Sequence, residues 1–298
     1  MNGKIIYCFT WNKMNFKNNF IEAKDHLVSG EIFKIKWDPT KGRAATQVKP
    51  SLDLSAYYNS QDYTSHKESD FSFIEKIYVF VQNRMFRYKA SIVKQTTRDK
   101  TLLDFGSGIG AFCSFMQEQG YNVSGIEPMN RPRTIAKEKG LNVFQSLKKI
   151  PKTVHYDIIT LWHVLEHLPK PEKTINKLAK LLHTKGVIIV AVPNLSSYDS
   201  DFYGQKWAAL DVPRHLWHFT SRGVLNLMQS EGFFLKETHP LWFDALYISY
   251  LSEKHSGSYF PFLRGVIIGL LSNFKALFTG EYSSLIYVFS KSEPYQED

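Results

Sequence analysis

The stretch from Thr101 to Pro128 constrains the fold of this chain more than any other part of it. Its residues predict a short apolar strand, a tight turn, one helix and a second strand that ends on an acid, Glu127. The turn contains three alternating glycines: Gly106, Gly108 and Gly110. Glycine is used where the backbone takes a positive φ or approaches a ligand more closely than a Cβ allows. The pattern predicts a nucleoside site, with the ligand against N–H groups of the turn and the ribose hydroxyls on Glu127.

Apolar runs and helical periods alternate from residue 100 to the end of the chain. The expected strands are 101–105, 122–127, 141–144, 157–162, 187–192, 233–238 and 284–290. The expected helices are 111–119, 131–139, 172–182 and 221–231. This alternation predicts an α/β fold: a doubly wound, mostly parallel, Rossmann-like seven-stranded sheet with helices on both faces. Ligands of such sheets bind beyond the carboxyl ends of the strands, where the glycine turn, Glu127 and Trp162 fall.

The first 95 residues precede this pattern and predict an N-terminal extension on the substrate side. Residues 31–37 alternate apolar and polar positions as a strand does, and a turn at 38–42 would return the chain along 44–48. A short helix is expected at 51–58 and a long one at 71–94. We therefore expect two parts, an extension over 1–95 and a main domain over 96–298 with a helical insertion at about 240–280.

Charge and cysteine content exclude several classes of function. The 298 residues include 37 Lys and Arg against 28 Asp and Glu, a formal charge of +9, without a single dense basic run. We therefore expect solvated surface lysines and no binding of nucleic acid. The two cysteines, Cys8 and Cys113, provide neither a disulfide framework nor metal-ligand spacing. The N-terminus lacks the apolar core of an export signal, so we expect a cytoplasmic protein.

Two kinds of cofactor fit the glycine turn. Residues 106–111 also match the dinucleotide pattern G-x-G-x-x-G/A, which leaves an NAD-dependent oxidoreductase as an alternative. Three features argue against it. Asp104 would lie close to a pyrophosphate, which a carboxylate repels, and about 100 residues precede a turn that usually opens such folds. The histidine-rich loop from His163 to His167 after the fourth strand is not required by a dehydrogenase.

Four sequence segments resemble the class I S-adenosylmethionine-dependent methyltransferases. LLDFGSGIG is similar to their glycine-rich first motif, and VSGIEP to their second-strand acid motif. DIITLWHVLEHLPKP resembles the fourth-strand motif of the ubiquinone-biosynthesis-like branch. DVPRHLWHFT is similar to a segment of bacterial small-molecule methyltransferases. The resemblance implies S-adenosyl-L-methionine as the cofactor and residues 101–192 as the core of its binding domain.

The resemblance places the methionine part of the cofactor at the ends of the first and fourth strands. This part would be held by the side chain of Asp104 and by the turn, comprising Gly106, Ser107, Gly108 and Gly110. Trp162 and His163 would lie beneath it.

The nucleoside part would lie at the ends of the second and third strands. Glu127 would accept the ribose hydroxyls, and Pro128 would lie beside the adenine. Gln145 and Ser146 stand where this family contacts the adenine amine. His66, which precedes the sheet, is a candidate for a lid over the cofactor, and a solvated loop histidine is the alternative.

Methyl transfer needs an acceptor in line with the methyl group, and a base helps when the acceptor is a hydroxyl. Histidine is the natural base near neutral pH. His215 is the first candidate because it follows the fifth strand at the same end of the sheet, and His163 is the second. We expect transfer to a small-molecule acceptor, with oxygen favoured over nitrogen or carbon. A non-catalytic S-adenosylmethionine-binding regulator or partner subunit is the alternative.

His163, Glu166 and His167 also allow a metal interpretation. In a helix, His163 and His167 would share a face as metal ligands do, and quinone-biosynthetic O-methyltransferases of similar pattern are associated with a divalent cation. Alternatively, Glu166 and His167 brace the loop around Leu168. We favour bracing and predict no metal site.

Residues 260–278 form the last informative stretch. Their longest uncharged run, 265–274, is too short to span a bilayer, while the apolar residues make one helical face. Packing on its own domain, a cover over the active site, a dimer contact and peripheral membrane contact all remain open. The aromatic residues from Trp242 to Tyr259 indicate an apolar, aromatic or lipid-like substrate. We expect a monomer or a homodimer.

Overall fold

The computed structural model describes residues 19–58, 73–97, 100–151 and 153–291. The chain divides into two compact units. Unit 1 comprises Met1–Ser65, Val192–Asn226 and His239–Leu285. Unit 2 comprises His66–Ala191, Leu227–Thr238 and Ile286–Asp298. The predicted boundary at residue 95 stays a prediction.

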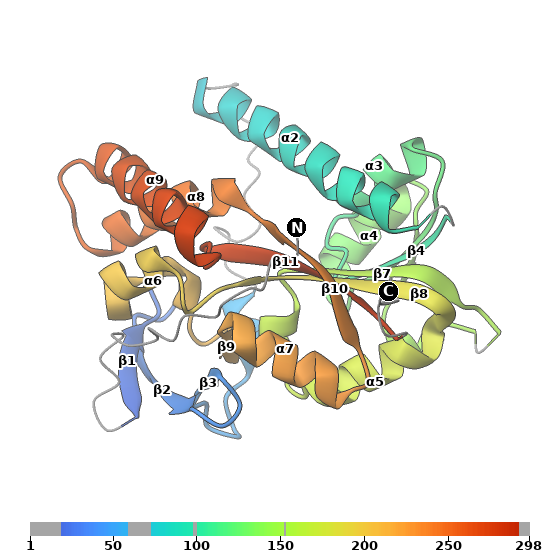
Figure 1. Cartoon of the computed structure of the whole chain (residues 1–298), viewed down its shortest axis with the longest axis horizontal. Helices are drawn as coiled ribbons and strands as arrows, with labels where there is room; N and C mark the ends of the chain where they lie inside the picture. Colours follow the sequence, from blue (N-terminus) through green and yellow to red (C-terminus); the bar gives the residue numbers. More distant parts are fainter. Residues whose placement is uncertain (1–18, 59–72, 98–99, 152, 292–298) are drawn as a thin grey trace, which may run out of the picture. The chain divides into compact units, whose positions relative to one another are not determined.

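The larger of the two sheets has seven strands (Figure 1). Most of its residues belong to unit 2. Its strands are β4 (Thr101–Phe105), β5 (Asn122–Ile126), β6 (Asn142–Phe144), β7 (Tyr156–Trp162), β8 (Leu182–Pro193), β10 (Phe234–Pro240) and β11 (Ser284–Ser290). Their order in the sheet is β10-β11-β8-β7-β4-β5-β6. The pairs β4–β5, β4–β7, β5–β6 and β7–β8 are parallel. The predicted doubly wound, mostly parallel sheet is therefore confirmed.

Helices pack on both faces of this sheet. They are α2 (Phe73–Thr96), α3 (Ala111–Glu118), α4 (Asn130–Glu138), α5 (Pro171–Leu181) and α7 (Ser221–Ser230). Figure 1 shows α3 and α4 on one face and α5 on the other. Parallel strands covered on both faces should be apolar throughout, and the central ones are: Leu102, Leu103, Ile158, Ile159, Ile188 and Ile189 are fully buried.

The strand order reverses beside β4. The chain leaves β4 toward β5 and β6 on one side and then crosses to β7 on the other. Asp104 near the end of β4 pairs with Thr160 near the end of β7. A crevice opens at such a reversal because the connections leave the sheet in opposite directions. The residues that follow β4, β5 and β7 are therefore the ones to examine for a ligand site.

Unit 1 contains a second, four-stranded sheet in the order β1-β2-β3-β9. Its strands are β1 (Phe20–Lys24), β2 (Ile32–Asp38), β3 (Arg43–Thr46) and β9 (Trp217–Phe219), and all neighbours are antiparallel. The predicted hairpin is present as β2 and β3. Sequence patterning did not predict β9, because three residues are too few to show a period.

Helices of unit 1 are α6 (Tyr198–Tyr203), α8 (Trp242–His255) and α9 (Pro261–Thr279). Single-turn 3-10 helices complete the list of elements: η1 (Leu54–Tyr57), η2 (Leu147–Lys149), η3 (Leu165–His167), η4 (Gly204–Lys206) and η5 (Ala208–Leu210). The helices α8 and α9 are the expected helical insertion and pack against each other.

Three local expectations need correction. The helix expected at 51–58 is only η1, because Asp53 rather than Ser51 caps it, accepting a hydrogen bond from Ser55 N at 2.9 Å. The strand expected at 187–192 is longer in the structure, because β8 begins at Leu182, which pairs with Tyr156. The uncharged run 265–274 is too short to span a bilayer, but the helix α9 extends beyond it on both sides. By length and composition alone, the whole of α9 is long and apolar enough to cross a membrane.

Candidate active site

The three glycines of the turn have different tasks. All three have positive φ, namely 82° at Gly106, 53° at Gly108 and 75° at Gly110. A Cβ on Gly106 would lie 2.4 Å from Val164 Cγ2, and one on Gly110 would lie 2.2 Å from Leu141 Cδ1. Gly108 faces open space, with nothing within 4 Å of such a Cβ. Two glycines thus permit close packing, and Gly108 leaves room for a ligand.

Four N–H groups of the turn are already used inside the protein, and that of Gly110 donates to Ser107 O at 2.9 Å. Those of Gly106 and Ser107 donate to Ile126 O at 2.8 and 2.9 Å. That of Gly108 donates to Glu127 Oε2 at 3.0 Å. The bonds of Gly106, Ser107 and Gly108 tie the turn after β4 to the end of β5, and the expected contact of a ligand with the turn stays a prediction.

Glu127 is placed to receive a diol. It is 7% exposed, and each of its oxygens accepts one backbone hydrogen bond, from Met129 N at 2.7 Å and from Gly108 N at 3.0 Å. Burial raises the pKa of Glu127, while these N–H groups and Arg133 act in the opposite direction. Each carboxylate oxygen has a second lone pair, so the group can accept two more hydrogen bonds. That geometry suits two adjacent hydroxyls.

Asp104 lies in the core rather than in an open site. It is 3% exposed, accepts a hydrogen bond from Thr160 Oγ1 at 2.7 Å, and has Cys113 Sγ at 3.6 Å. Burial raises the pKa of Asp104 to about 6. Its side chain holds β4, β7 and α3 together, and its predicted contact with the methionine part stays a prediction.

Two buried polar atoms have no hydrogen-bond partner among the described residues: Ser107 Oγ in the turn and Trp162 Nε1 at the end of β7. Leaving such a group unsatisfied costs about 1–3 kcal/mol. A bound molecule with acceptor atoms removes that cost. Together with the space beside Gly108 and the open acceptor positions of Glu127, these atoms fit a nucleoside-containing cofactor such as S-adenosylmethionine.

The ring of Trp162 is fixed by two neighbours. Phe112 packs edge-on against it, with ring centroids 5.3 Å apart, and Lys89 Nζ lies 4.6 Å from its centroid. Lys89 comes from α2, and its charge also acts on the carboxyl of Asp104. Sequence reasoning missed Lys89 because α2 precedes the sheet and its lysines resemble ordinary surface residues.

The remaining predicted cofactor residues are exposed, half-buried or outside the described part of the chain. Pro128 is exposed, and its carbonyl accepts a hydrogen bond from Arg133 Nη1 at 2.7 Å. Gln145 is exposed and Ser146 half-buried, directly after β6. His66 lies outside the described residues. The roles of these four residues stay predictions.

His163 directly follows β7 and has a φ of 54°, which is rare for a residue with a side chain. Its N–H donates to Ala191 O at 2.9 Å, and its Nδ1 lies 3.5 Å from Oε1 of the buried Glu166. The next turn is the 3-10 helix η3, so His163 and His167 do not share a face of an α-helix. The shared helical face that the metal interpretation assumed is therefore absent. The choice between a metal site and a loop braced by Glu166 and His167 stays a prediction.

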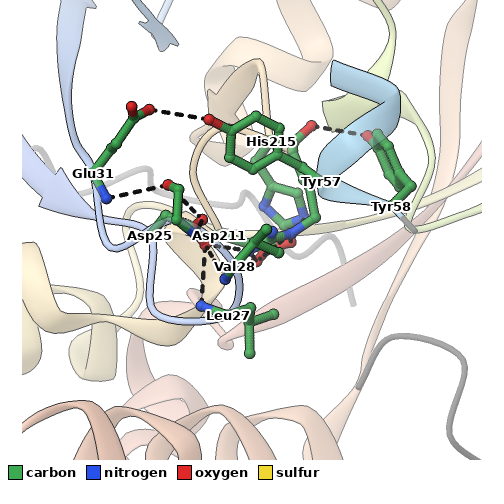
Figure 2. A network of polar contacts seen from close by, with 10 residues as sticks. Asp25, Leu27, Val28, Glu31, Tyr57, Tyr58, Asp211 and His215 are labelled. Carbon is green, nitrogen blue, oxygen red and sulfur yellow. Dashed lines mark hydrogen bonds and ion pairs between the residues drawn. The ribbon is translucent and has the colours of Figure 1, made fainter. Parts of the chain in front are cut away.

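His215 belongs to unit 1 and is held by a polar network (Figure 2). Its Nδ1 lies 2.8 Å from Ala209 O, so this nitrogen carries a proton. Its Nε2 lies 3.8 Å from Asp211 Oδ2. The carboxylate of Asp211 thus lies on the side of Nε2. The arrangement is suited to a general base.

The carboxylate of Asp211 is itself positioned by Arg214. Arg214 is 1% exposed and donates to Asp211 Oδ1 at 2.6 Å and to Asp25 Oδ1 at 3.1 Å. Burial acts to raise the pKa of Asp25, yet hydrogen bonds from Ser29 and Leu27 N–H and the charge of Arg214 leave it below its usual value. Sequence reasoning did not predict that His215 is supported by Asp211, Arg214 and Asp25. Asp25 is far from the other two in the chain.

His218 is structural. It is 4% exposed, and its Nε2 lies 2.9 Å from Thr46 Oγ1. Thr46 donates its own hydroxyl proton to His215 O at 2.6 Å, so it accepts from His218. His218 therefore donates from Nε2 to Thr46.

A family profile and curated proteins resemble this chain. The profile described as "Methyltransferase domain" matches residues 79–237, more than half of the chain. The ubiquinone biosynthesis O-methyltransferase of Saccharophagus degradans is 35% identical over 107 residues, which is 32% of this chain and 44% of that protein. The enzyme of the same name from Aliivibrio fischeri is 29% identical over 126 residues, 39% of this chain and 54% of that protein. The chain thus spans about half the length of these relatives.

Solved structures share the fold. Magnesium protoporphyrin IX methyltransferase from Synechocystis PCC 6803 with bound SAH superimposes with a TM-score of 0.52 at 16% identity. The superposition covers 79% of this chain and 97% of that one. At this identity the likeness concerns the fold alone.

Proposed function

We propose that this chain, which belongs to the methyltransferase domain family, transfers a methyl group from S-adenosylmethionine to a small-molecule acceptor. One observation supports the cofactor most directly. Glu127 follows β5 with two open acceptor positions and is bonded to Gly108, which faces open space. Trp162, at the end of β7, has an unsatisfied Nε1. When bound, S-adenosylmethionine supplies an electrophilic methyl group on a sulfonium.

The residues of this chain then have three tasks. Glu127 binds the ribose, and Trp162 and the open face at Gly108 orient the rest of the cofactor. His215 takes the proton of the acceptor hydroxyl at Nε2, and Asp211 stabilises the charge that this ring gains. His163 is the second candidate for proton transfer, because its ring nitrogen already lies near the buried carboxylate of Glu166.

An oxygen acceptor is favoured for two reasons. A positioned histidine is useful for a hydroxyl, whereas an amine needs no base. The curated relatives are named O-methyltransferases. The acceptor is of an aromatic or lipid-like class, in keeping with the aromatic side chains of α8. A monomer or homodimer in the cytoplasm, without nucleic acid, stays the expectation.

The test is turnover. The full chain is incubated with S-adenosylmethionine and a panel of phenols and catechols with and without alkyl tails, and formation of S-adenosylhomocysteine is measured. We expect acceptor-dependent product with at least one hydroxylated aromatic compound. Tight cofactor binding with no turnover on any oxygen, nitrogen or carbon acceptor would instead identify a non-catalytic regulator or partner subunit.

A further inference from the structure

Helix α9 exposes a continuous row of large apolar side chains. Leu263, Ile267, Leu270, Phe274 and Leu277 follow one another at spacings of three or four residues, and each is at least 48% exposed. Residues at this spacing lie along one face of an α-helix. The row runs from the first turn of α9 to the last. Soluble domains rarely leave such a long apolar surface in water.

The opposite side of α9 is lined with small residues. Gly265, Gly269, Ser272 and Ala276 repeat at the same spacing and are buried. A Cβ on Gly265 would lie 2.5 Å from Tyr250 Cα, and one on Gly269 would lie 2.7 Å from Ala245 O. The helices α8 and α9 therefore approach as closely as two backbones can.

This distribution is the reverse of an ordinary surface helix. An amphipathic helix of a soluble domain buries its large apolar residues and exposes polar ones. Here the small residues are buried and the large apolar ones are outside. Small residues between closely packed helices, with large apolar residues turned outward, are typical of helices whose outer side faces lipid.

The charges of α9 are confined to its flank. The helix has no acidic residue, and its two cations, Arg264 and Lys275, lie eleven residues apart and so on one line. Arg264 Nε lies 2.9 Å from Oε2 of the buried Glu253, and Lys275 Nζ lies 3.5 Å from the ring centroid of Tyr198. Both cations are largely exposed beside the apolar row. A surface of this kind is complementary to anionic lipid headgroups.

We infer that the apolar row of α9 docks unit 1 on the surface of an anionic lipid bilayer, with the helix lying in the plane of the interface. The inference is independent of the proposed methyl transfer. Aromatic residues stand at the N-terminal end of the helix, where Tyr259 and Phe260 are 96% and 70% exposed. Aromatic side chains favour the boundary between headgroups and acyl chains.

An in-plane position follows from what α9 is attached to. Its inner side contacts α8, which contains Asp244, Glu253 and Lys254. Ser272 on that side donates to Asp199 Oδ1 at 2.7 Å, and Asp199 also accepts from Ser283 and Trp207. Crossing the bilayer would carry these charged groups into hydrocarbon, at several kcal/mol each. Only the outer side of α9 is suited to lipid.

The test compares matched pairs of substitutions in the full chain. Leu263→Gln with Leu277→Gln removes one large apolar residue at each end of the apolar row. Phe20→Gln with Ile32→Gln makes the same kind of change at exposed positions of β1 and β2. Binding to vesicles of phosphatidylcholine, with or without phosphatidylglycerol, is measured by co-sedimentation. Circular dichroism and thermal melting check that both variants fold.

We expect the wild type to bind vesicles containing phosphatidylglycerol and to bind neutral vesicles more weakly. The α9 variant should bind at least about tenfold more weakly, because two large side chains no longer enter the interface. The β1–β2 variant should bind as the wild type does. Failure of the wild type to bind, or equal binding of the α9 variant, overturns the inference. A third result also overturns it: light scattering finds a dimer of the wild type and a monomer of the α9 variant, and neither protein binds vesicles. The partner of α9 is then a second copy of the chain.

Discussion

Asp104 and Glu127 are acids at the ends of neighbouring strands, and their surroundings give them different tasks. Asp104 is bound by Thr160 within the core, and burial raises its pKa to about 6. Glu127 holds two backbone N–H groups and retains a lone pair on each oxygen. We infer that Asp104 holds the strands in place and that Glu127 binds the ligand. The two acids therefore respond differently to substitution.

Replacing Asp104 with asparagine should change the dependence of stability on pH. The pKa of Asp104 is about 6 in the folded protein against 3.8 for the unperturbed group, so the folded state binds the proton more tightly. The free energy of unfolding contributed by this group is therefore highest below pH 3.8 and falls as the pH rises to about 6.

The Asp104→Asn variant lacks this loss. Its stability relative to the wild type should increase between pH 4 and pH 6, by roughly 3 kcal/mol at most. Urea unfolding of both proteins at these pH values measures the difference. A difference that does not vary with pH would show that Asp104 has the same pKa in the folded and the unfolded protein.

The proposed base makes a separate prediction at this scale. His215→Ala should leave the affinity for S-adenosylhomocysteine unchanged and lower kcat about 100-fold or more, because the acceptor proton loses its base. His183→Ala, at a histidine whose side chain is 54% exposed, is the control. If His215→Ala retains full activity, the acceptor does not need this residue, and His163→Ala becomes the variant to measure.

At the scale of the element, the glycine turn separates packing from binding. Gly110→Ala brings a Cβ to within 2.2 Å of Leu141 and should destabilise the protein by about 3 kcal/mol or more. Gly108→Ala meets no atom within 4 Å and should cost only about 1–2 kcal/mol, from its positive φ. Cofactor affinity, however, should fall more for Gly108→Ala. Urea unfolding of both variants compares their losses of stability, and titration calorimetry compares their losses of cofactor affinity.

The pair of helices α8 and α9 gives a second prediction for elements. Gly269→Ala places a Cβ 2.7 Å from Ala245 O and should destabilise the fold by about 1–3 kcal/mol. Leu270→Ala, one residue later, removes a larger side chain from an exposed position and should change the stability by less than about 0.5 kcal/mol. Thermal melting of the two variants compares them. Equal losses would mean that Leu270 is covered in solution.

Elements with a clear period could be predicted from the sequence. The strands β4, β5, β7 and β11 are short apolar runs, and their expected bounds agree with the structure to within one residue. The strand β9 has only three residues and forms because β3 offers it an edge, and β1 forms against β2. Such pairing depends on residues far away in the chain, which no local pattern contains.

For the molecule as a whole, the seven-stranded sheet explains why a candidate cofactor site could be predicted from the sequence. In a parallel sheet the carboxyl ends of the strands meet at one edge, so Gly108, Glu127 and Trp162 could be grouped without a structure. The resemblance to class I S-adenosylmethionine-dependent methyltransferases is confirmed by the family match, which disfavours the NAD-dependent alternative.

The support of the site could not be predicted in the same way. The contact of Asp104 with Thr160 depends on the register of β4 against β7, and that of Arg214 with Asp25 joins residues 189 positions apart. Sequence spacing also suggested a helix over His163–His167, which the positive φ of His163 prevents. Long-range register and local strain therefore set the limit of prediction for this chain.

Titration calorimetry of the full chain with S-adenosylhomocysteine tests the central claim most directly. We expect one site with micromolar affinity or better in the wild type. Glu127→Gln should weaken it about tenfold or more, because the ribose loses a charged acceptor, while Glu138→Gln on the exposed side of α4 should bind as the wild type does. Absence of binding in the folded wild type, or equal affinity of Glu127→Gln, would contradict the account.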